Sequence, residues 1–326
     1  MIDNKQNCPV CGSINIMHIT LVDEIFGLYR CKNCEFVFAL PRPTLEELEE
    51  FYNTELKYNY KPMPQNEKKA KLSTKRLHNL IEKYKPDARK ILDLGCSYGH
   101  TIYGLKQWGY EVVGTDLSED ACEYALKYYD IKVYNQEFPS ETEYSSYDVL
   151  ILSQIIEHII DPVMYLNKAV SYLKNDGIIF IGTPNIDRIL FNIFLKNYEP
   201  VKPPEHISYF NHKSIKILAQ RCGLTILKVY TESPIWVNYN LLNYLFFSIL
   251  RRLKVLQAVR KKVNPAIKNA IASSTGITKK SKFWSGVQVI IDYLTRILSL
   301  LLYPLIKVVD EKNKGLVLFA IAKKSI

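Results

Sequence analysis

The sequence lacks acidic residues over one long stretch. No Asp or Glu occurs between Glu232 and Asp292, while residues 251–282 contain ten Lys or Arg. The formal net charge of the whole chain is +10, so this one segment accounts for it and the remainder is balanced. The basic character therefore belongs to a segment, and any attraction to an anionic partner is expected there.

Long apolar runs are also absent. Residues 241–249 are apolar but fall short of the ~20 residues that a spanning helix needs. Residues 287–309 are longer but include charged side chains. Apolar helices flanked by Lys and Arg suit a membrane interface; a helical dimer interface or a lid over the substrate are the alternatives. Nucleic-acid binding is not expected, because the basic run contains no recognised module.

The chain shows no tandem repeat and no low-complexity tract, and its 326 residues allow one large domain or two modest ones. The N-terminus is polar and reaches Cys8 without an apolar stretch, so no signal peptide is predicted. We expect a cytoplasmic protein with reduced thiols. Peripheral attachment to the inner face of the membrane is expected if the basic segment binds lipid.

Four of the seven cysteines have the spacing of a zinc ribbon. Cys8 and Cys11 form one Cys-x-x-Cys pair, and Cys31 and Cys34 form another after 19 intervening residues. Two such pairs predict a structural zinc site with four thiolates and no open position. The metal would supply most of the folding energy of so small a unit. Disulfides or a redox pair are the alternatives.

A strand, a glycine turn and a helix follow one another in residues 90–99. The apolar residues up to Leu94 predict a buried strand, Gly95 begins the turn and Gly99 opens a helix. Backbone N–H groups and the positive end of a helix meet at such a point. A second strand ends at Asp116, about 20 positions after Gly95, where an acid is placed to bind ribose hydroxyls.

The turn lacks the middle glycine of a dinucleotide fingerprint. Ser97 occupies that position, although the second glycine is what lets a pyrophosphate approach. Asp93 would repel a pyrophosphate but could hold an ammonium group. The ligand indicated is a nucleoside joined to an amino acid without phosphate, which describes S-adenosylmethionine. A nicotinamide-dependent dehydrogenase and an ordinary glycine-capped turn are the alternatives.

Two segments carry a resemblance to a known family. Asp-Leu-Gly-Cys-Ser-Tyr-Gly at 93–99 and Val-Val-Gly-Thr-Asp-Leu-Ser at 112–118 resemble the class I S-adenosylmethionine-dependent methyltransferases. The branch is that of the ubiquinone-biosynthesis O-methyltransferases and of surface-glycan methyltransferases. The resemblance implies an α/β fold, a Rossmann-like seven-stranded methyltransferase sheet. This chain departs from the family pattern by a C-terminal helical insertion before the last strand, where the family's chain turns back quickly. The expected domains are a zinc ribbon at 1–43, a methyltransferase core at 44–232, a basic helical insertion at 233–312 and the last strand at 313–326.

The resemblance also implies which residues hold the cofactor. Residues of the glycine turn would hold the methionine part, Asp116 the ribose, and Leu117 the adenine face. The end of a third strand, expected over 131–137, would also face the adenine. The candidate cofactor-binding residues are Asp93, Gly95, Cys96, Ser97, Gly99, Asp116, Leu117, Glu137, Phe138 and Ser153.

Two histidines, His158 and His206, are the candidate catalytic residues. In the related ubiquinone enzymes a Ser-Glu-x-x-Glu-His segment is associated with a divalent metal. Here Glu157 and His158 match, but Gln154 replaces the first acid, and a neutral amide is a poorer ligand for a hard cation. His158 is either a general base near the methyl acceptor or a residue that ties the loop by hydrogen bonds. His206 either orients or deprotonates an acceptor hydroxyl, or packs under its loop.

The sequence therefore predicts a methyltransferase for a small-molecule or lipid-linked acceptor, with O-methylation of a glycan or quinone type as the main expectation. The reaction would be an in-line displacement at the sulfonium methyl, catalysed mainly by positioning. The alternative is a methyltransferase fold that has lost its chemistry and acts as a scaffold at the membrane surface. No pattern in the sequence specifies the acceptor, a catalytic metal or the oligomeric state.

Overall fold

The described part of the chain forms one large compact unit and the ends of a second. The computed structural model describes residues 7–22, 24–54, 63–187, 201–233, 310–312 and 314–325. Residues 1–232 and 313–326 form the first unit, and residues 233–312 form the second. The helical insertion predicted at 233–312 thus lies outside the described residues except at its two ends. No helix within the described ranges is both long and apolar enough to cross a membrane.

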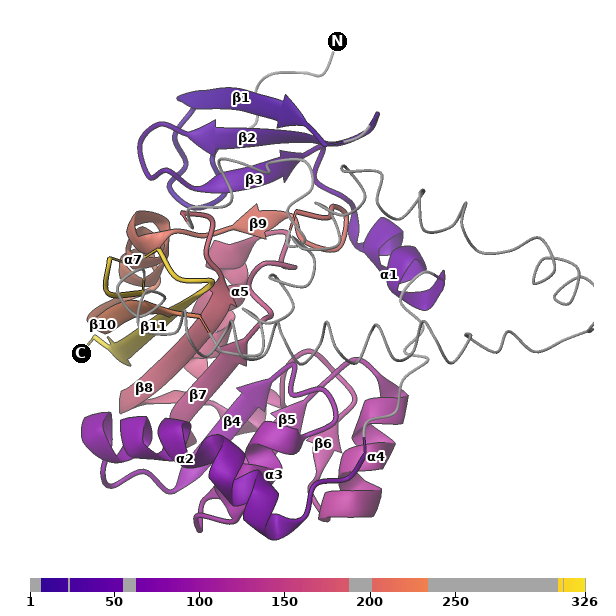
Figure 1. Cartoon of the computed structure of the whole chain (residues 1–326), viewed down its shortest axis with the longest axis vertical. Helices are drawn as coiled ribbons and strands as arrows, with labels where there is room; N and C mark the ends of the chain where they lie inside the picture. The colour runs from indigo at the N-terminus through magenta and orange to yellow at the C-terminus, as the bar shows by residue number, and fades with distance from the viewer. Residues whose placement is uncertain are drawn as a thin grey trace, which may run out of the picture. The chain divides into compact units, whose positions relative to one another are not determined.

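A seven-stranded sheet forms the centre of the first unit (Figure 1), in the order β10-β11-β8-β7-β4-β5-β6. Its strands are β4 (Lys90–Leu94), β5 (Glu111–Thr115), β6 (Val133–Tyr134), β7 (Tyr147–Ser153), β8 (Leu173–Pro184), β10 (Leu224–Glu232) and β11 (Val317–Lys324). Neighbours from β8 to β6 run parallel, and β11 is antiparallel to both β8 and β10. This order confirms the predicted mixed α/β, Rossmann-like sheet.

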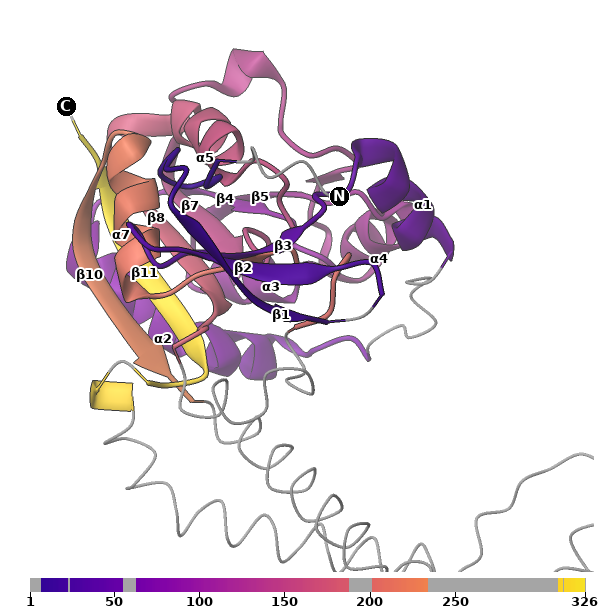
Figure 2. The same ribbon diagram turned by 90° about the horizontal axis from the view of Figure 1, so that it is seen from above.

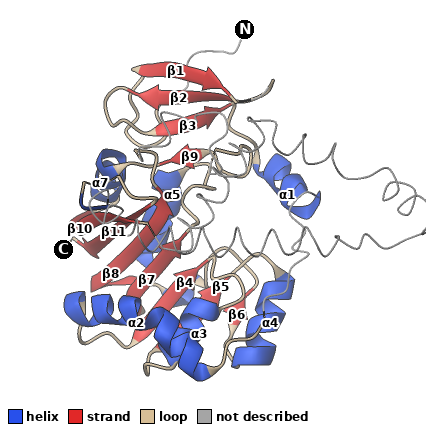
Figure 3. Ribbon diagram, in the orientation of Figure 1, coloured by secondary structure: helices blue, strands red, loops and turns tan. Residues whose placement is uncertain are grey.

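Helices pack on both faces of this sheet (Figures 2 and 3). They are α2 (Glu67–Tyr84), α3 (His100–Lys106), α4 (Glu119–Tyr129), α5 (Pro162–Ser171) and α7 (His212–Arg221), with the turn η1 (Glu141–Glu143) before β7. Ile91 and Val149 pack with α2 and α3, whereas Leu92 and Leu150 pack with α5 and α7. Successive strand residues point to opposite faces, so strands covered on both sides are apolar throughout.

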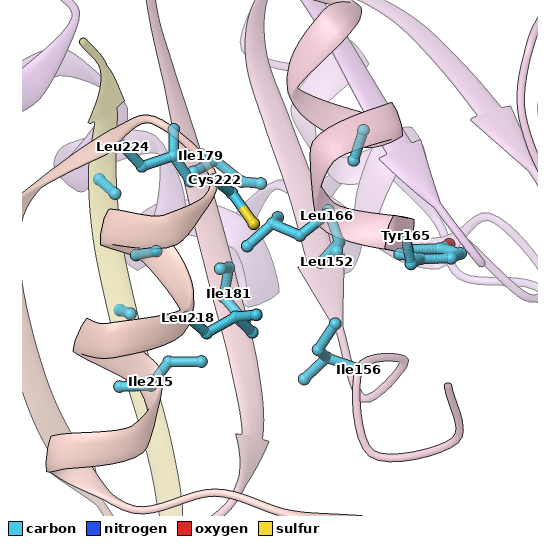
Figure 4. Close-up of a cluster of buried hydrophobic side chains, with 14 of the residues drawn as sticks. Leu152, Ile156, Tyr165, Leu166, Ile179, Ile181, Ile215, Leu218, Cys222 and Leu224 are labelled. Atoms are coloured by element: carbon cyan, nitrogen blue, oxygen red, sulfur yellow. The ribbon is translucent and has the colours of Figure 1, made fainter. Parts of the chain in front are cut away.

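The core on the α5 and α7 side is closely packed. Figure 4 shows Leu166 of α5 close to Leu218 of α7 and to Cys222, the residue that follows α7, beside Ile181 of β8. Polar caps at the helix starts agree with the sequence: the Asp161 carboxylate accepts the first N–H groups of α5. This cap fixes the point at which the loop after β7 ends.

The third strand is shorter than the sequence predicts. The expected strand at 131–137 is only Val133–Tyr134, at the edge of the sheet. The chain leaves the sheet after Tyr134, and Phe138 enters the core, where it packs on the rings of Tyr165 and Tyr172. Among the described strands β6 lies at one edge of the sheet, and beyond it the burial of Phe138 holds the chain against the core.

The cysteine-containing segment forms a second sheet that includes a strand from far along the chain. Its strands are β1 (Ile16–Leu21), β2 (Gly27–Cys31), β3 (Val37–Leu40) and β9 (Ser208–Tyr209), and the helix α1 (Leu45–Thr54) follows it. Figure 1 shows β9 beside β3. Phe36 and Phe38 pack in the same hydrophobic cluster as Phe210 and the residues of α5 and α7. The small sheet therefore shares its core with the large one.

Candidate active site

The candidate site lies at the carboxyl ends of β4, β5, β7 and β8. These strands are parallel neighbours, so the residues that follow Leu94, Thr115 and Ser153 meet at one edge of the sheet. The strand order reverses between β4 and β7. In open α/β sheets ligands bind outside the carboxyl ends at such a reversal.

Glycine at position 95 is required by its surroundings. Its φ is +67°, and a Cβ there would lie 2.2 Å from Cδ1 of Ile155. Ile155 belongs to the loop after β7, so this loop lies directly against the turn after β4. Ser97 in the same turn also adopts a positive φ of 50°. The N–H groups of Cys96 and Gly99 donate within the protein, to the carbonyls of Thr115 and Cys96, so the shape of the turn is fixed by its own hydrogen bonds.

Asp116 is joined to that turn. Its carboxylate accepts hydrogen bonds from the N–H groups of Ser97, at 2.7 Å, and Ser118, at 2.9 Å. Burial raises the pKa of Asp116, and these two bonds lower it. Each carboxylate oxygen has a further lone pair, so the side chain can still accept a bond from a ribose hydroxyl.

Asp93 is a buried acid at the end of β4, with 4% of its surface exposed. Burial and the nearby charge of Asp116 raise the pKa of Asp93 to about 8. Both causes penalise the ionised form of the carboxyl group. A cation placed beside it would offset both, which is the property expected of an ammonium-binding residue.

The other candidates near the turn occupy different surroundings. Cys96 is buried, and its Sγ lies 2.5 Å from where a Cβ would stand on Gly114. Burial raises the pKa of this thiol well above its ordinary value. Leu117, just after β5, is 74% exposed, and Ser153 is exposed at the end of β7. The edge thus offers one buried thiol and two accessible side chains.

The two candidates after β6 differ from each other. The carbonyl oxygen of Glu137 accepts a hydrogen bond from Thr115 Oγ1 at 3.1 Å, which holds this segment beside the end of β5. The side chain of Glu137 is exposed, whereas Phe138 is 6% exposed and belongs to the core. Glu137 therefore lies on the open surface, and Phe138 supports the segment from the core.

His158 and His206 lie together, although 47 residues separate them in sequence. Their ring centroids are 4.6 Å apart and the rings are nearly perpendicular, at 86°. Nδ1 of His158 is 2.9 Å from the carbonyl oxygen of Glu205. A carbonyl oxygen can only accept, so Nδ1 carries the proton and the lone pair of the neutral ring is on Nε2. Burial lowers the pKa of His158, which favours that neutral form.

Glu157 completes the histidine cluster from the protein interior. Glu157 is 1% exposed. Its Oε2 accepts a hydrogen bond from the Thr183 hydroxyl at 3.0 Å. Its Oε1 is buried and has no hydrogen-bond partner among the described residues. Burial raises the pKa of Glu157 to about 8. The ligand atoms of Glu157, His158 and His206 lie within 4.8 Å of one another. One carboxylate and two imidazoles form a donor set that divalent transition metals accept.

The four cysteines of the small sheet also converge. All four Sγ atoms lie within 4.8 Å of one another, with Cys8 3.5 Å from Cys34 and Cys11 3.5 Å from Cys31. None of them forms a disulfide. A zinc ion with bonds of about 2.3 Å holds tetrahedral sulfurs roughly 3.8 Å apart. The cluster therefore fits a four-thiolate zinc site.

Comparison with known proteins places the site within a matched region. The family model described as "Methyltransferase domain" matches residues 65–229. This range includes the glycine turn, Asp116 and both histidines, and it excludes the four cysteines.

Individual relatives are distant. The ubiquinone biosynthesis O-methyltransferase of an Azoarcus species is 27% identical over 168 residues, which are 47% of this chain and 72% of that protein. The protein of the same description from Hydrogenovibrio crunogenus is 26% identical over 149 residues, 42% of this chain and 62% of that protein. The crystal structure of a SAM-dependent methyltransferase from Archaeoglobus fulgidus has 19% identity and a TM-score of 0.43, over 78% of this chain and 94% of that one.

Proposed function

Because the chain belongs to the methyltransferase-domain family, we propose that it transfers a methyl group from S-adenosylmethionine to a hydroxyl of a small-molecule or lipid-linked acceptor. The observation that carries the proposal is the buried Asp93 carboxyl beside the glycine turn and Asp116. S-adenosylmethionine combines an ammonium group, which would offset the burial of Asp93, with a ribose diol for Asp116. A dinucleotide would bring phosphate charge to the same acids.

The residues after β4 and β5, which we call the cofactor half of the edge, bind S-adenosylmethionine and orient its methyl group. S-adenosylmethionine supplies a methyl group that the sulfonium charge has already activated. Asp93 holds the ammonium group, the backbone around Gly95 contacts the methionine part, and Asp116 accepts from the ribose. Leu117 offers an exposed apolar side chain to the adenine. Holding two reactants in line supplies most of the rate enhancement in such a reaction.

His158 acts as the general base on the acceptor half. Its Nδ1 donates to the Glu205 carbonyl, so Nε2 takes the proton of the acceptor hydroxyl. The lowered pKa keeps this nitrogen unprotonated at neutral pH. His206, whose ring stands perpendicular to that of His158, orients the acceptor. Alternatively, the same two rings with Glu157 would hold a divalent ion. Nε2 of His158 would then be a metal ligand and not the base, and the ion would supply Lewis acidity toward the acceptor oxygen.

The relatives named as ubiquinone biosynthesis O-methyltransferases support an oxygen acceptor. The basic, apolar stretch before β11 supports a lipid-linked or membrane-associated one. We also propose that Cys8, Cys11, Cys31 and Cys34 hold a structural zinc ion, because their sulfur spacing fits a tetrahedral site.

Calorimetric titration of the full, zinc-loaded chain tests the proposal. We expect binding of S-adenosylmethionine and S-adenosylhomocysteine, and none of NAD. Asp93→Asn should weaken binding about tenfold or more, since a charge-assisted contact is lost. Asp148→Asn is the matched control, because Asp148 is equally buried but lies at the opposite end of the sheet, where it pairs with Lys174.

Absence of heat with the wild-type protein would contradict the proposal and favour the scaffold role. Equal binding by wild type and Asp93→Asn would remove the ammonium contact from it. The acceptor is found by incubating the enzyme with cell extracts and searching by mass spectrometry for compounds that gain one CH₂ group.

A further inference from the structure

A single arginine, Arg42, lies between the small sheet and the histidine cluster. It stands between two prolines directly after β3, and its Nε is buried. Burial lowers the pKa of Arg42 to about 10, while the charge of Asp161 raises it. The side chain therefore remains a cation at neutral pH, and it is half-buried.

The acceptors of this cation come from two distant segments of the chain. Nη1 donates to the Ile207 carbonyl at 2.6 Å. Nη2 donates to the carbonyl of Ile159 at 2.9 Å, to the carbonyl of Ile160, and to the Ser208 hydroxyl at 3.0 Å. Ile159 and Ile160 directly follow one histidine, and Ile207 and Ser208 directly follow the other. One guanidinium thus joins the backbone beside both candidate catalytic residues.

Backbone hydrogen bonds run through the same place. The N–H groups of Ile207 and Ser208 both donate to the Glu157 carbonyl at 3.0 Å, and the Ala39 N–H of β3 donates to the Ile207 carbonyl at 3.1 Å. The small sheet therefore reaches the histidine cluster by two routes, through the pairing of β3 with β9 and through Arg42.

We propose that Arg42 is a positioning residue for methyl transfer, which holds the segments 158–160 and 206–208 at a fixed separation so that His158 and His206 face one acceptor. The proposal rests on the proposed function only for the roles of these two histidines. Its geometric part, the coupling of the two segments, stands without it.

The energetics favour coupling over simple packing. A buried guanidinium is costly unless its N–H groups have acceptors. Here three carbonyls and a hydroxyl accept from Nη1 and Nη2, while the buried Nε has no partner among the described residues. Displacement of either segment would leave part of the charge without acceptors. Because both segments supply acceptors to the same guanidinium, movement of either one costs free energy and weakens the hold on the other. A lysine could not replace this arrangement, because a single ammonium lacks the planar fork of donors.

Hydrogen exchange of the full, zinc-loaded chain, with Arg42→Lys, tests the coupling. We expect the amides of His158, Ile207 and Ser208 to exchange about tenfold faster, the order expected when charge-assisted hydrogen bonds are lost. Both segments should loosen together, while zinc content and protection of β1 and β2 stay unchanged.

Arg221→Lys is the matched control. Arg221 also donates from Nη1 to a carbonyl of the small sheet's segment, that of Val10, but it lies on α7 and has no bond to the histidine segments. It should leave the exchange of those segments as in the wild type. Equal loosening by both variants would overturn the proposal, and so would unchanged exchange in either segment of Arg42→Lys.

A spectroscopic reading separates positioning from general stability. The ring resonances of His158 and His206 should shift together in Arg42→Lys, because the edge-to-face contact of the two rings is lost when the segments separate, and this is followed by NMR of ¹³C-labelled histidine. Loss of zinc together with loosening of β1 and β2 would show that Arg42 only maintains the small sheet, which would overturn the proposal. Calorimetry with S-adenosylmethionine tests the proposed function independently, since a wild-type protein that binds none of it would refute that function. The hydrogen-exchange data would still decide whether Arg42 couples the two segments.

Discussion

At the scale of the residue, two acids determine how this site responds to pH. Asp93 and Glu157 are both almost fully buried, and burial raises the pKa of each to about 8. Asp93 faces the cofactor half of the edge, and Glu157 lies under the histidines. In the ligand-free protein both carboxyls therefore keep a proton at neutral pH, a state that is suited to receiving a cation in exchange.

These shifts predict how stability changes with pH. An unfolded acid loses its proton near pH 4. Between this pH and about pH 8, the folded chain keeps a proton that the unfolded chain has lost. The free energy of unfolding therefore falls as pH rises through this window, by about 1.4 kcal/mol per pH unit for each group.

Glu157→Gln should make this decline shallower by about 1.4 kcal/mol per pH unit, because glutamine can still accept from Thr183 without titrating. Urea unfolding between pH 5 and pH 7.5, about the centre of the window, measures the slope. Glu119→Gln, at an exposed acid of α4, should leave the slope unchanged. An unchanged slope in Glu157→Gln would contradict the predicted ionisation.

At the scale of the element, the loop after β7 restricts which residue can occupy position 95 in the turn between β4 and α3. Gly95→Ala should destabilise the protein by more than the roughly 1–2 kcal/mol of a left-handed alanine, because the new methyl group would overlap Ile155. Adding Ile155→Ala should recover the excess. Chemical denaturation measures both effects, and calorimetry should show weaker S-adenosylmethionine binding.

Gly109→Ala is the control for that experiment. Gly109 also has a positive φ, +94°, but a Cβ there would meet nothing within 4 Å. Gly109→Ala should lose only the stability that alanine costs at a positive φ. If both alanine variants lost the same stability, the contact between Ile155 and the turn would not matter.

The cysteine cluster is the second element with a direct test. Cys34→Ser, or treatment with a strong chelator, should release one zinc ion per chain and remove amide protection from β2 and β3. Because β3 pairs with β9, protection of Ser208 should fall as well. Elemental analysis and hydrogen exchange measure these changes. Cys122→Ser, at a half-buried cysteine outside the cluster, should retain the metal.

Elements with local signals could be predicted from the sequence. The bounds of α2 and the caps Ser118, Asp161 and Asn211 follow from polar residues placed directly before periodic segments. The convergence of the four cysteines followed from spacing. The last strand, separated from β10 by a long segment, required the family resemblance, because pairing between distant strands leaves no local trace.

Parts of the site had no such signal. His158 and His206 were each recognised, but their contact depends on β9, a two-residue strand that no periodicity reveals. Arg42, between prolines, reads as an exposed linker residue, since its acceptors are backbone carbonyls that exist only in the fold. The burial of Phe138 likewise depends on where the edge of the sheet ends.

At the scale of the whole molecule, positive charge is concentrated in one segment. Residues 251–282 carry ten Lys or Arg without an acid, and each cation near an anionic bilayer contributes about 1 kcal/mol. The full chain should sediment with vesicles that contain phosphatidylglycerol and remain in solution with phosphatidylcholine alone. Binding should weaken at high salt, because ions screen the attraction.

Changing Arg251, Arg252 and Lys254 to Gln should weaken that binding by on the order of a hundredfold. The control variant changes three exposed lysines of α2 to Gln: Lys68, Lys75 and Lys83. It removes the same charge from the first unit and should bind as the wild type does. Equal losses in both variants would point to net charge, and indifference of the wild type to vesicles would remove the membrane hypothesis.

The pairing of the end of β10 with the start of β11 allows the stretch of chain between them to change in length during evolution. Glu232 and Val317 are paired across these strands, so the long stretch between them leaves and re-enters the sheet at points about 5 Å apart. Closing a loop becomes only slowly more costly as it lengthens. Descendants can therefore enlarge, trim or exchange that stretch without disturbing strand order.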